Sequence, residues 1–154
     1  MKHRIRAAAL VVHEDSILLV KHVYPDTGES FWVPPGGGLE DVDDSIFACA
    51  AREVFEETGL TVTLSRIAYI REFMETAMDT MHIEIFLFAE SATGTITLEH
   101  LPPGQPDSDM IKESRFISRE ELPTLTVYPA ELRDVFWEHH AKGFPETHYL
   151  GRTY

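Results

Sequence analysis

Residues 52–59, REVFEETG, gather three glutamates directly behind one arginine. On a helix, Glu53, Glu56 and Glu57 fall at i, i+3 and i+4, so their carboxylates project from one face. Like charges this close repel unless something positive lies among them. Oxygen ligands held in this way suit a hard divalent cation, Mg²⁺ or Mn²⁺, which leaves positions open for water and phosphate oxygens. The spacing therefore indicates a metal site for phosphate chemistry.

Three glutamates on a helix, taken alone, are more often a solvated face than a metal site. The neighbouring residues favour the metal site. Gly36, Gly37 and Gly38 precede the helix, and their bare backbone would let a ligand approach closely. Arg52 lies on the flank of Glu56 and can orient a glutamate through a fork-shaped hydrogen bond.

The helix that must position these carboxylates is predicted over residues 44–58. Its apolar residues fall at i, i+3, i+4 and i+7 and form one buried stripe, about 100° from the glutamate face; they are Phe47, Ala50, Ala51 and Val54. Asp43, Asp44 or Ser45 can cap its start, and Gly59 ends it.

The remaining elements are predicted from shorter patterns. Strands are expected over residues 4–13, 16–22, 31–33, 61–72, 81–89, 95–98 and 114–117, and helices over 119–122 and 129–139. Residues 36–38 are expected to be a loop, because three glycines hold regular structure only at a high entropic cost. The order predicts a single α/β domain over residues 1–154, with a mixed sheet between helical layers.

The stretch from Gly38 to Leu60 resembles the Nudix box of the MutT-like Nudix hydrolases. The family pattern is Gly, five residues, Glu, seven residues, Arg-Glu, an aliphatic residue, any residue, Glu-Glu, any residue, Gly and an aliphatic residue. This chain departs from it at Asp44, where the family has Glu. The resemblance implies an α/β/α sandwich and hydrolysis of a diphosphate joined to another group.

The resemblance also implies roles for individual residues. Glu53, Glu56 and Glu57 would bind the metal, with the carbonyl of Gly38 as a further ligand, and Arg52 would orient Glu53. Asp44 matches a glutamate that commonly pairs with the box arginine. Because Asp is shorter, Asp43 could take over that pairing.

The general base that takes a proton from the attacking water is expected either in the box or in a loop. Glu53 is the candidate in the box, and Asp107, Asp109 and Glu113 are loop candidates that could equally be solvated acids.

Substrate contacts are expected on two strands. Arg4 and Arg6 alternate with apolar residues, so they share a face and could hold a phosphate, although a solvated edge is an equal alternative. Phe31 and Trp32 could stack on a base, although an aromatic residue beside a sheet is more often core.

Composition limits the partners and the compartment. The net charge of −13 argues against binding a nucleic acid polymer, and no apolar run is long enough to span a membrane. A lone cysteine, Cys49, excludes an internal disulfide and fits the cytoplasm. The expected partner is a small nucleotide-type diphosphate, and the aromatic tail over residues 143–154 could cover the site or join a homodimer.

Three functions remain open on these grounds. The first is a hydrolase that needs a divalent metal and acts on a nucleoside triphosphate or a nucleotide-linked diphosphate. The second is a Nudix fold that senses a nucleotide without cleaving it, although the intact glutamates and arginine would then have little use. The third is an acidic interaction domain.

Overall fold

The computed structural model describes residues 1–154 and contains two sheets. The larger, five-stranded sheet has the order β5-β1-β7-β6-β9. Its strands are β1 (Lys2–Leu10), β5 (Gly36–Gly38), β6 (Thr61–Glu75), β7 (Thr80–Thr93) and β9 (His148–Thr153). β1 pairs in parallel with β7 and β6 pairs in parallel with β9, whereas β5–β1 and β6–β7 are antiparallel. The sheet is therefore mixed, as predicted.

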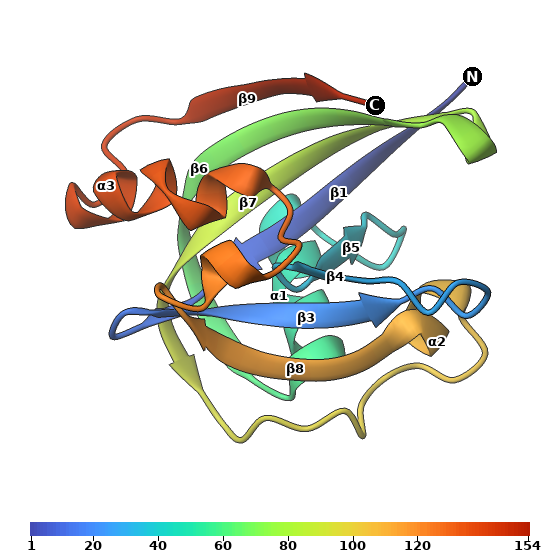
Figure 1. Cartoon of the computed structure of the whole chain (residues 1–154), viewed down its shortest axis with the longest axis horizontal. Coiled ribbons are helices and arrows are strands. Elements are labelled where there is room, and N and C mark those ends of the chain that lie inside the picture. Colours follow the sequence, from blue (N-terminus) through green and yellow to red (C-terminus); the bar gives the residue numbers. More distant parts are fainter.

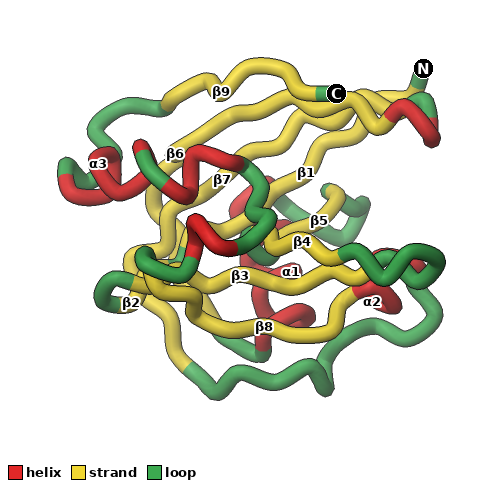
Figure 2. The backbone as a smooth tube through the Cα atoms, viewed as in Figure 1, coloured by secondary structure: helices red, strands yellow, loops and turns green.

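The smaller sheet is built around β3 (Ser16–Val23), which pairs antiparallel with β2 (Val12–His13), β4 (Ser30–Val33) and β8 (Ile111–Ser118). Figure 2 shows this sheet below the larger one, with α2 (Pro106–Met110) near the end of β3 and β8. An opening, a cavity of about 560 Å³, lies where α2 and the turn between β6 and β7 meet the beginning of β1.

Two helices cover opposite faces of the larger sheet. α1 (Ile46–Thr58) packs Ala50 and Val54 against β1 and β7, and α3 (Val135–Ala141) places Phe136 in the core on the other face with Tyr69 and Phe86. This is the predicted α/β/α arrangement (Figure 1). None of the helices combines the length and the apolar character that a membrane crossing needs.

Strand register arranges polar side chains in two rows on the α3 face of the larger sheet. Residues aligned across neighbouring strands share a face, so Arg4, His82 and Phe73 form one row. The next row, one pleat closer to the core, contains Arg6, Glu84 and Arg71. Arg4 and His82, from the first row, line this opening.

The glycine run is a strand, so the predicted loop over residues 36–38 is wrong. Gly36, Gly37 and Gly38 pair antiparallel with Ala8, Ala7 and Arg6 as the edge strand β5. The glycines serve close approach, because a Cβ at Gly36 would lie 2.6 Å from the carbonyl oxygen of Ala7. Pairing with β1 supplies the hydrogen bonds that a glycine strand would otherwise lack.

Other boundaries also differ from the prediction. Residues 95–98 form no strand, because Thr97 instead donates its amide hydrogen to the carbonyl of Thr58, at 3.0 Å, beside the end of α1. Residues 119–121 are turns, followed by a 3₁₀ helix at Leu122–Thr124. The helix expected over residues 129–139 divides at Asp134 into a 3₁₀ helix (Ala130–Arg133) and α3.

The C-terminal segment forms β9 along β6, at the opposite edge of the sheet from β5 (Figure 1). In this position it does not cover the carboxylates of α1. Its outer edge is unpaired within the chain.

Candidate active site

α1 begins and ends at well-defined caps, which fix where its carboxylates lie. The Ser45 hydroxyl accepts a hydrogen bond from the amide of Ala48 at 3.1 Å, and Gly59 closes the helix with a φ of 78°. Of the three predicted caps, the sequence therefore uses Ser45. The helix then directs Glu53 and Glu57 toward β5.

β5 receives these carboxylates directly against its backbone. The amide of Gly36 donates a hydrogen bond to Glu57 Oε1 at 2.9 Å. A Cβ at Gly37 would overlap the carboxyl group of Glu53, and one at Gly38 would overlap the guanidinium of Arg4. Glycine is therefore required at this wall because acidic and basic side chains lie on it.

Arg52 joins the carboxylates into one network. Its Nε and Nη2 donate to both oxygens of Asp43, each at 2.8 Å, and its Nη1 lies 3.0 Å from Glu53 Oε1 and 3.4 Å from Glu56. The shorter side chain of Asp44 is exposed and takes no part, so Asp43 provides the pairing that the family pattern assigns to the other position. The bonds from Arg52 lower the pKa of Asp43 to about 2.

Two of the glutamates are held where a negative charge is costly. Glu57 is 4% exposed, and burial raises its pKa well above the usual value, with a further contribution from the charge of Glu53. Burial also raises the pKa of Glu53. Burial therefore disfavours the charged form of these carboxyl groups, and a bound cation would favour it.

Arg4 and Arg6 approach β5 from β1, on the face of the sheet opposite to Glu53. The guanidinium of Arg4 lies on Gly38, and the charge of Arg6 acts on both Glu53 and Glu57. Nε of Arg6 is buried and has no hydrogen-bond partner. The structure thus brings Glu53, Glu57 and the two arginines together around β5.

Known proteins share both the sequence pattern and this fold. Phosphatase NudJ from Escherichia coli strain K12 is 33% identical over 121 residues, which cover 79% of this chain and 72% of NudJ. A NUDIX hydrolase from Nitrosomonas europaea has a TM-score of 0.72 and 21% identity, covering 92% of this chain and 90% of its own. A MutT protein from Methanosarcina mazei Go1 has a TM-score of 0.68 and 25% identity, with coverage of 92% and 96%. The family model for the NUDIX domain matches residues 2–140.

The chain belongs to the Nudix hydrolase family. It is therefore an enzyme that hydrolyses a diphosphate bond, and the family generally uses divalent metals and small nucleotide-type substrates. In this Nudix hydrolase the site consists of the α1 carboxylates, Arg52 and the glycine strand β5.

Trp32 was predicted as a residue that could stack on a base, but in this Nudix hydrolase it lies in the core. It is 4% exposed and packs in the main core, and the guanidinium of Arg115 lies 5.0 Å from its ring centre. Alternation along β4 turns Trp32 inward and its neighbour Phe31 outward. Phe31 is thus the aromatic residue of this pair that a ligand can reach.

Sequence reasoning missed three aromatic residues around Phe31. His22 pairs with Phe31 across β3 and β4, and the two rings stack with centres 5.1 Å apart at 13°. Tyr24 and Tyr128 lie 5.3 and 5.9 Å from Phe31, and both are partly exposed. The alternation of His22 and Tyr24 could have indicated a shared face, but Tyr128 arrives from a distant segment and left no local signal.

The three loop acids lie at different places in the Nudix hydrolase. Asp107, in α2, lines a cavity of about 560 Å³ together with Arg4 and His82. Asp109 is exposed on the same short helix, and Glu113, on β8, is paired with Arg115 at 3.1 Å. Of these acids, Asp107 is the one that faces the opening between the sheets.

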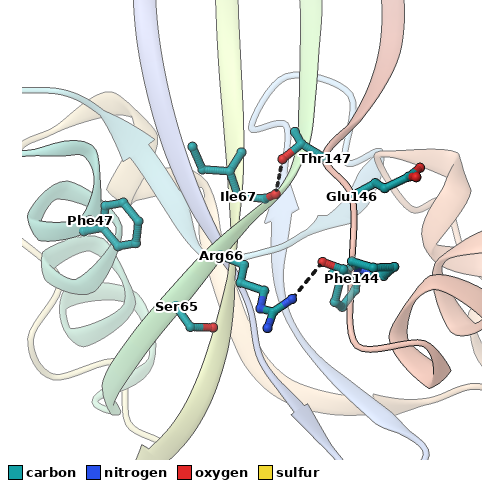
Figure 3. A pocket seen from close by; sticks show the side chains of 8 residues that line it. Phe47, Ser65, Arg66, Ile67, Phe144, Glu146 and Thr147 are labelled. Atoms are coloured by element: carbon teal, nitrogen blue, oxygen red, sulfur yellow. Dashed lines mark hydrogen bonds between the residues drawn. The ribbon is translucent and has the colours of Figure 1, made fainter.

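A separate shallow groove of about 470 Å³ lies between α1 and the C-terminal segment (Figure 3). There Arg66 donates a hydrogen bond to the carbonyl of Phe144 at 3.4 Å, and Thr147 donates to the carbonyl of Ile67 at 2.6 Å. Glu146 is the one acid that lines the groove, so it lacks the carboxylate cluster found at β5.

Proposed function

We propose that this Nudix hydrolase cleaves the diphosphate of a nucleoside triphosphate, or of a nucleoside diphosphate linked to another group. One observation carries the proposal. The crowded carboxylates of α1, of which Glu57 is buried, lie on one side of the glycine strand β5, and Arg4 and Arg6 of β1 lie on the other. This arrangement suits a polyphosphate chain, because one wall supplies acids for metal and the other supplies positive charge for phosphate oxygens.

The residues at β5 fit a hard divalent cation, Mg²⁺ or Mn²⁺. We assign Glu53, Glu56 and Glu57 as ligands, with the carbonyl of Gly38 as a fourth. All are oxygen donors, and the raised pKa of Glu57 reflects a charge that lacks compensation. No three acidic, histidine or cysteine side chains converge closely enough to form a ready-made site. Loading would therefore require the glutamates to turn from Arg52 and Gly36.

The bound cation would lower the pKa of an attacking water and offset charge on the leaving phosphate. The remaining steps belong to this chain's own residues. Arg4 and Arg6 would bind phosphate oxygens and align the chain along β1, and Arg52, fixed by Asp43, would orient Glu53. We assign Glu53 as the general base, because its carboxyl group lies against Gly37 inside the site and is held there by Arg52.

The surroundings of the enzyme are part of the proposal. A net charge of −13 and a single cysteine support a small-molecule substrate, no nucleic acid polymer and a cytoplasmic location. A homodimer, if formed, would use the free edge of β9, and sedimentation of the purified protein would measure it.

The deciding experiment is hydrolysis of a nucleotide panel with and without Mg²⁺, using Glu57→Gln. The variant keeps an acceptor for the Gly36 amide but loses the charge, so activity should fall by at least about 10²-fold. Because a buried carboxylate is removed, thermal stability at neutral pH should rise or stay unchanged. Glu90→Gln, an exposed acid on β7, is the matched control and should change neither quantity.

Retained activity in Glu57→Gln would contradict the assignment of the metal ligands. Tight nucleotide binding without turnover of any nucleotide, in Mg²⁺ or Mn²⁺, would instead indicate a sensor.

A further inference from the structure

The 560 Å³ cavity beside the carboxylate site can hold whatever is joined to the diphosphate. It opens where the beginnings of β1 and β7 meet α2, and of its ten lining residues only one is hydrophobic. Arg4 lines this cavity and also lies on Gly38, so the cavity continues directly from β5. A group attached to a phosphate at Arg4 would therefore enter it.

One lining residue of this cavity has a buried nitrogen without a partner. Five such atoms occur in the chain: Arg6 Nε, His22 Nδ1, Arg71 Nε, His82 Nδ1 and His148 Nδ1. Of these residues, His82 lines the cavity. Unpartnered buried polar atoms are rare in folded proteins and call for a ligand or water that completes them. The free Nδ1 of His82 at the cavity therefore points to a ligand.

His82 is the best-defined of these groups. Its Nε2 lies 2.8 Å from Glu75 Oε2, and its side chain is 3% exposed. A carboxylate only accepts hydrogen bonds, so Nε2 carries the proton, and in the neutral ring Nδ1 is an acceptor. Phe73 stacks on the imidazole at 4.3 Å and 5°, which fixes the plane of the ring. A ligand that completes the neutral imidazole would therefore offer a donor to Nδ1 of His82.

An aromatic cluster outside the lining residues of the cavity suits a flat ring. It consists of Phe31, Tyr24 and Tyr128, with His22 stacked on Phe31. Aromatic side chains favour planar partners by stacking.

Positively charged side chains and hydrogen-bond acceptors occupy different parts of the opening. Arg4 and Arg6, on β1, lie next to β5, whereas the acceptors Glu75 and His82 lie farther across the sheet on β6 and β7. Asp107 adds another acceptor from α2. Phosphates would thus bind near β5, and a group rich in hydrogen-bond donors would bind beyond them.

We propose that the group joined to the diphosphate carries, through a sugar, a planar base with an exocyclic amino group, and that His82 Nδ1 accepts a hydrogen bond from this amino group. His82 is then a specificity-determining residue, and Glu75 positions it by fixing its tautomer. The inference rests on the proposed function, since it names the nucleotide class that the site prefers.

The test compares nucleotides that differ in an amino or an oxo group at one ring position: CTP with UTP, and ATP with ITP. In the presence of Mg²⁺, kcat/KM should favour the amino member by about 10- to 100-fold, mainly through KM. His82→Phe keeps a flat ring on Phe73 but has no acceptor. It should bring the members of each pair to within about twofold, with kcat for the amino substrates largely retained.

Two further variants control for structural damage. Glu75→Gln keeps a hydrogen bond to His82 but no longer fixes the tautomer, so the amino preference should shrink without loss of folding. His3→Phe changes another histidine of the same cavity and should leave the preference intact. Equal kcat/KM within both pairs for the unaltered enzyme, or a preference that survives in His82→Phe, would overturn the inference.

Binding to the metal-free protein separates this inference from the proposed function. Calorimetric titration with CMP, UMP, AMP and IMP should show the same amino preference, and His82→Phe should abolish it. If no nucleotide is hydrolysed but this preference is present, the proposed function fails and the inference stands. If nucleotides are hydrolysed but neither assay shows the preference, the inference fails and the proposed function stands.

Discussion

Charged side chains have opposite environments at the two edges of the larger sheet. At the β5 edge, Glu57 is buried with a raised pKa, and Arg6 has a buried Nε without a partner. At the β9 edge, Glu72 accepts hydrogen bonds from Tyr149 and from Arg152, the latter at 3.2 Å, in exposed surroundings. One edge concentrates costly charge, and the other contains pairs that solvent screens.

This difference indicates that the β5 edge is less stable than the β9 edge in the absence of a ligand. Crowded buried carboxylates and unpartnered donors destabilise a fold unless a ligand completes them. Exposed ion pairs contribute little to stability and need no ligand. Substitutions that move the carboxylates at the β5 edge should therefore act mainly on activity, whereas those of the ion pairs at the β9 edge should act weakly on both activity and stability.

The addition of one methyl group at each edge tests this difference most directly. Gly37→Ala places a Cβ on the carboxyl group of Glu53, which must move, so kcat/KM should fall by about 10²-fold. Gly151→Ala, on β9, meets no atom within 4 Å but has a φ of 86°, so it should cost about 1 kcal/mol of stability and no activity. Steady-state kinetics and thermal unfolding measure the two effects.

A second glycine tests whether the Gly37 effect is specific. Gly36→Ala would push its Cβ against the backbone of Ala7, so its main effect should be a lower melting temperature. If Gly37→Ala instead lowers mainly the melting temperature, as Gly36→Ala does, then Gly37 is needed for folding rather than for the position of Glu53.

The next effect concerns the Asp43–Arg52 pair, which stabilises the β5 edge. Arg52 lowers the pKa of Asp43 from 3.8 to about 2, so the pair stabilises the folded state above pH 4, and this contribution is lost as the pH falls toward 2. Asp43→Asn should lower the free energy of unfolding at pH 7 by about 2 kcal/mol and remove that part of the acid transition. Urea unfolding at several pH values measures it.

Asp44→Asn is the matched control, because Asp44 is exposed and has no contact with Arg52. An equal loss of stability in both variants would contradict the assignment of Asp43 as the partner of Arg52.

The sequence predicts best what depends on neighbouring residues. The period of Ala50 and Val54, the cap at Ser45 and the stop at Gly59 are local signals, and the structure has α1 where they indicate. The glutamate face follows from the same period. The sequence also offered Asp43 as the alternative partner of Arg52, although it could not choose between two adjacent acids.

What the sequence could not predict depends on distant partners. β5 exists because three glycines pair with β1, about thirty residues away, and local propensity argues against a strand there. Trp32 and Phe31 alternate, but which of them faces the core is decided by the segment at Val127 that lies beside β4. β9 likewise requires parallel pairing with β6. Such pairings leave no periodic signal in either partner.

A smaller effect is expected at Asp107, the loop alternative to Glu53 as the general base. Glu53 lies on Gly37 inside the site, whereas Asp107 is exposed in α2, so Asp107→Asn should lower kcat by less than about tenfold. Glu53→Gln should lower kcat by at least about 10²-fold. If Asp107→Asn shows the larger loss in single-turnover measurements, the base lies in the loop and the β5 edge supplies only metal ligands.

The smallest effect is expected at the β9 edge, where Glu72→Gln removes the charge shared by Tyr149 and Arg152. The hydroxyl of Tyr149, followed by Arg152, lowers the pKa of Glu72, so the charged form is the one that stabilises this edge above the ordinary glutamate pKa. Because Tyr149 and Arg152 are exposed and Glu72 is only half-buried, solvent and salt screen the interaction, and the melting temperature and kcat/KM should stay close to those of the unaltered enzyme. A loss of activity comparable to that of Gly37→Ala would mean that β9 transmits strain through β6 to Arg71 and Phe73. The two edges would then work as one unit, and their contrast in charge would no longer separate function from stability.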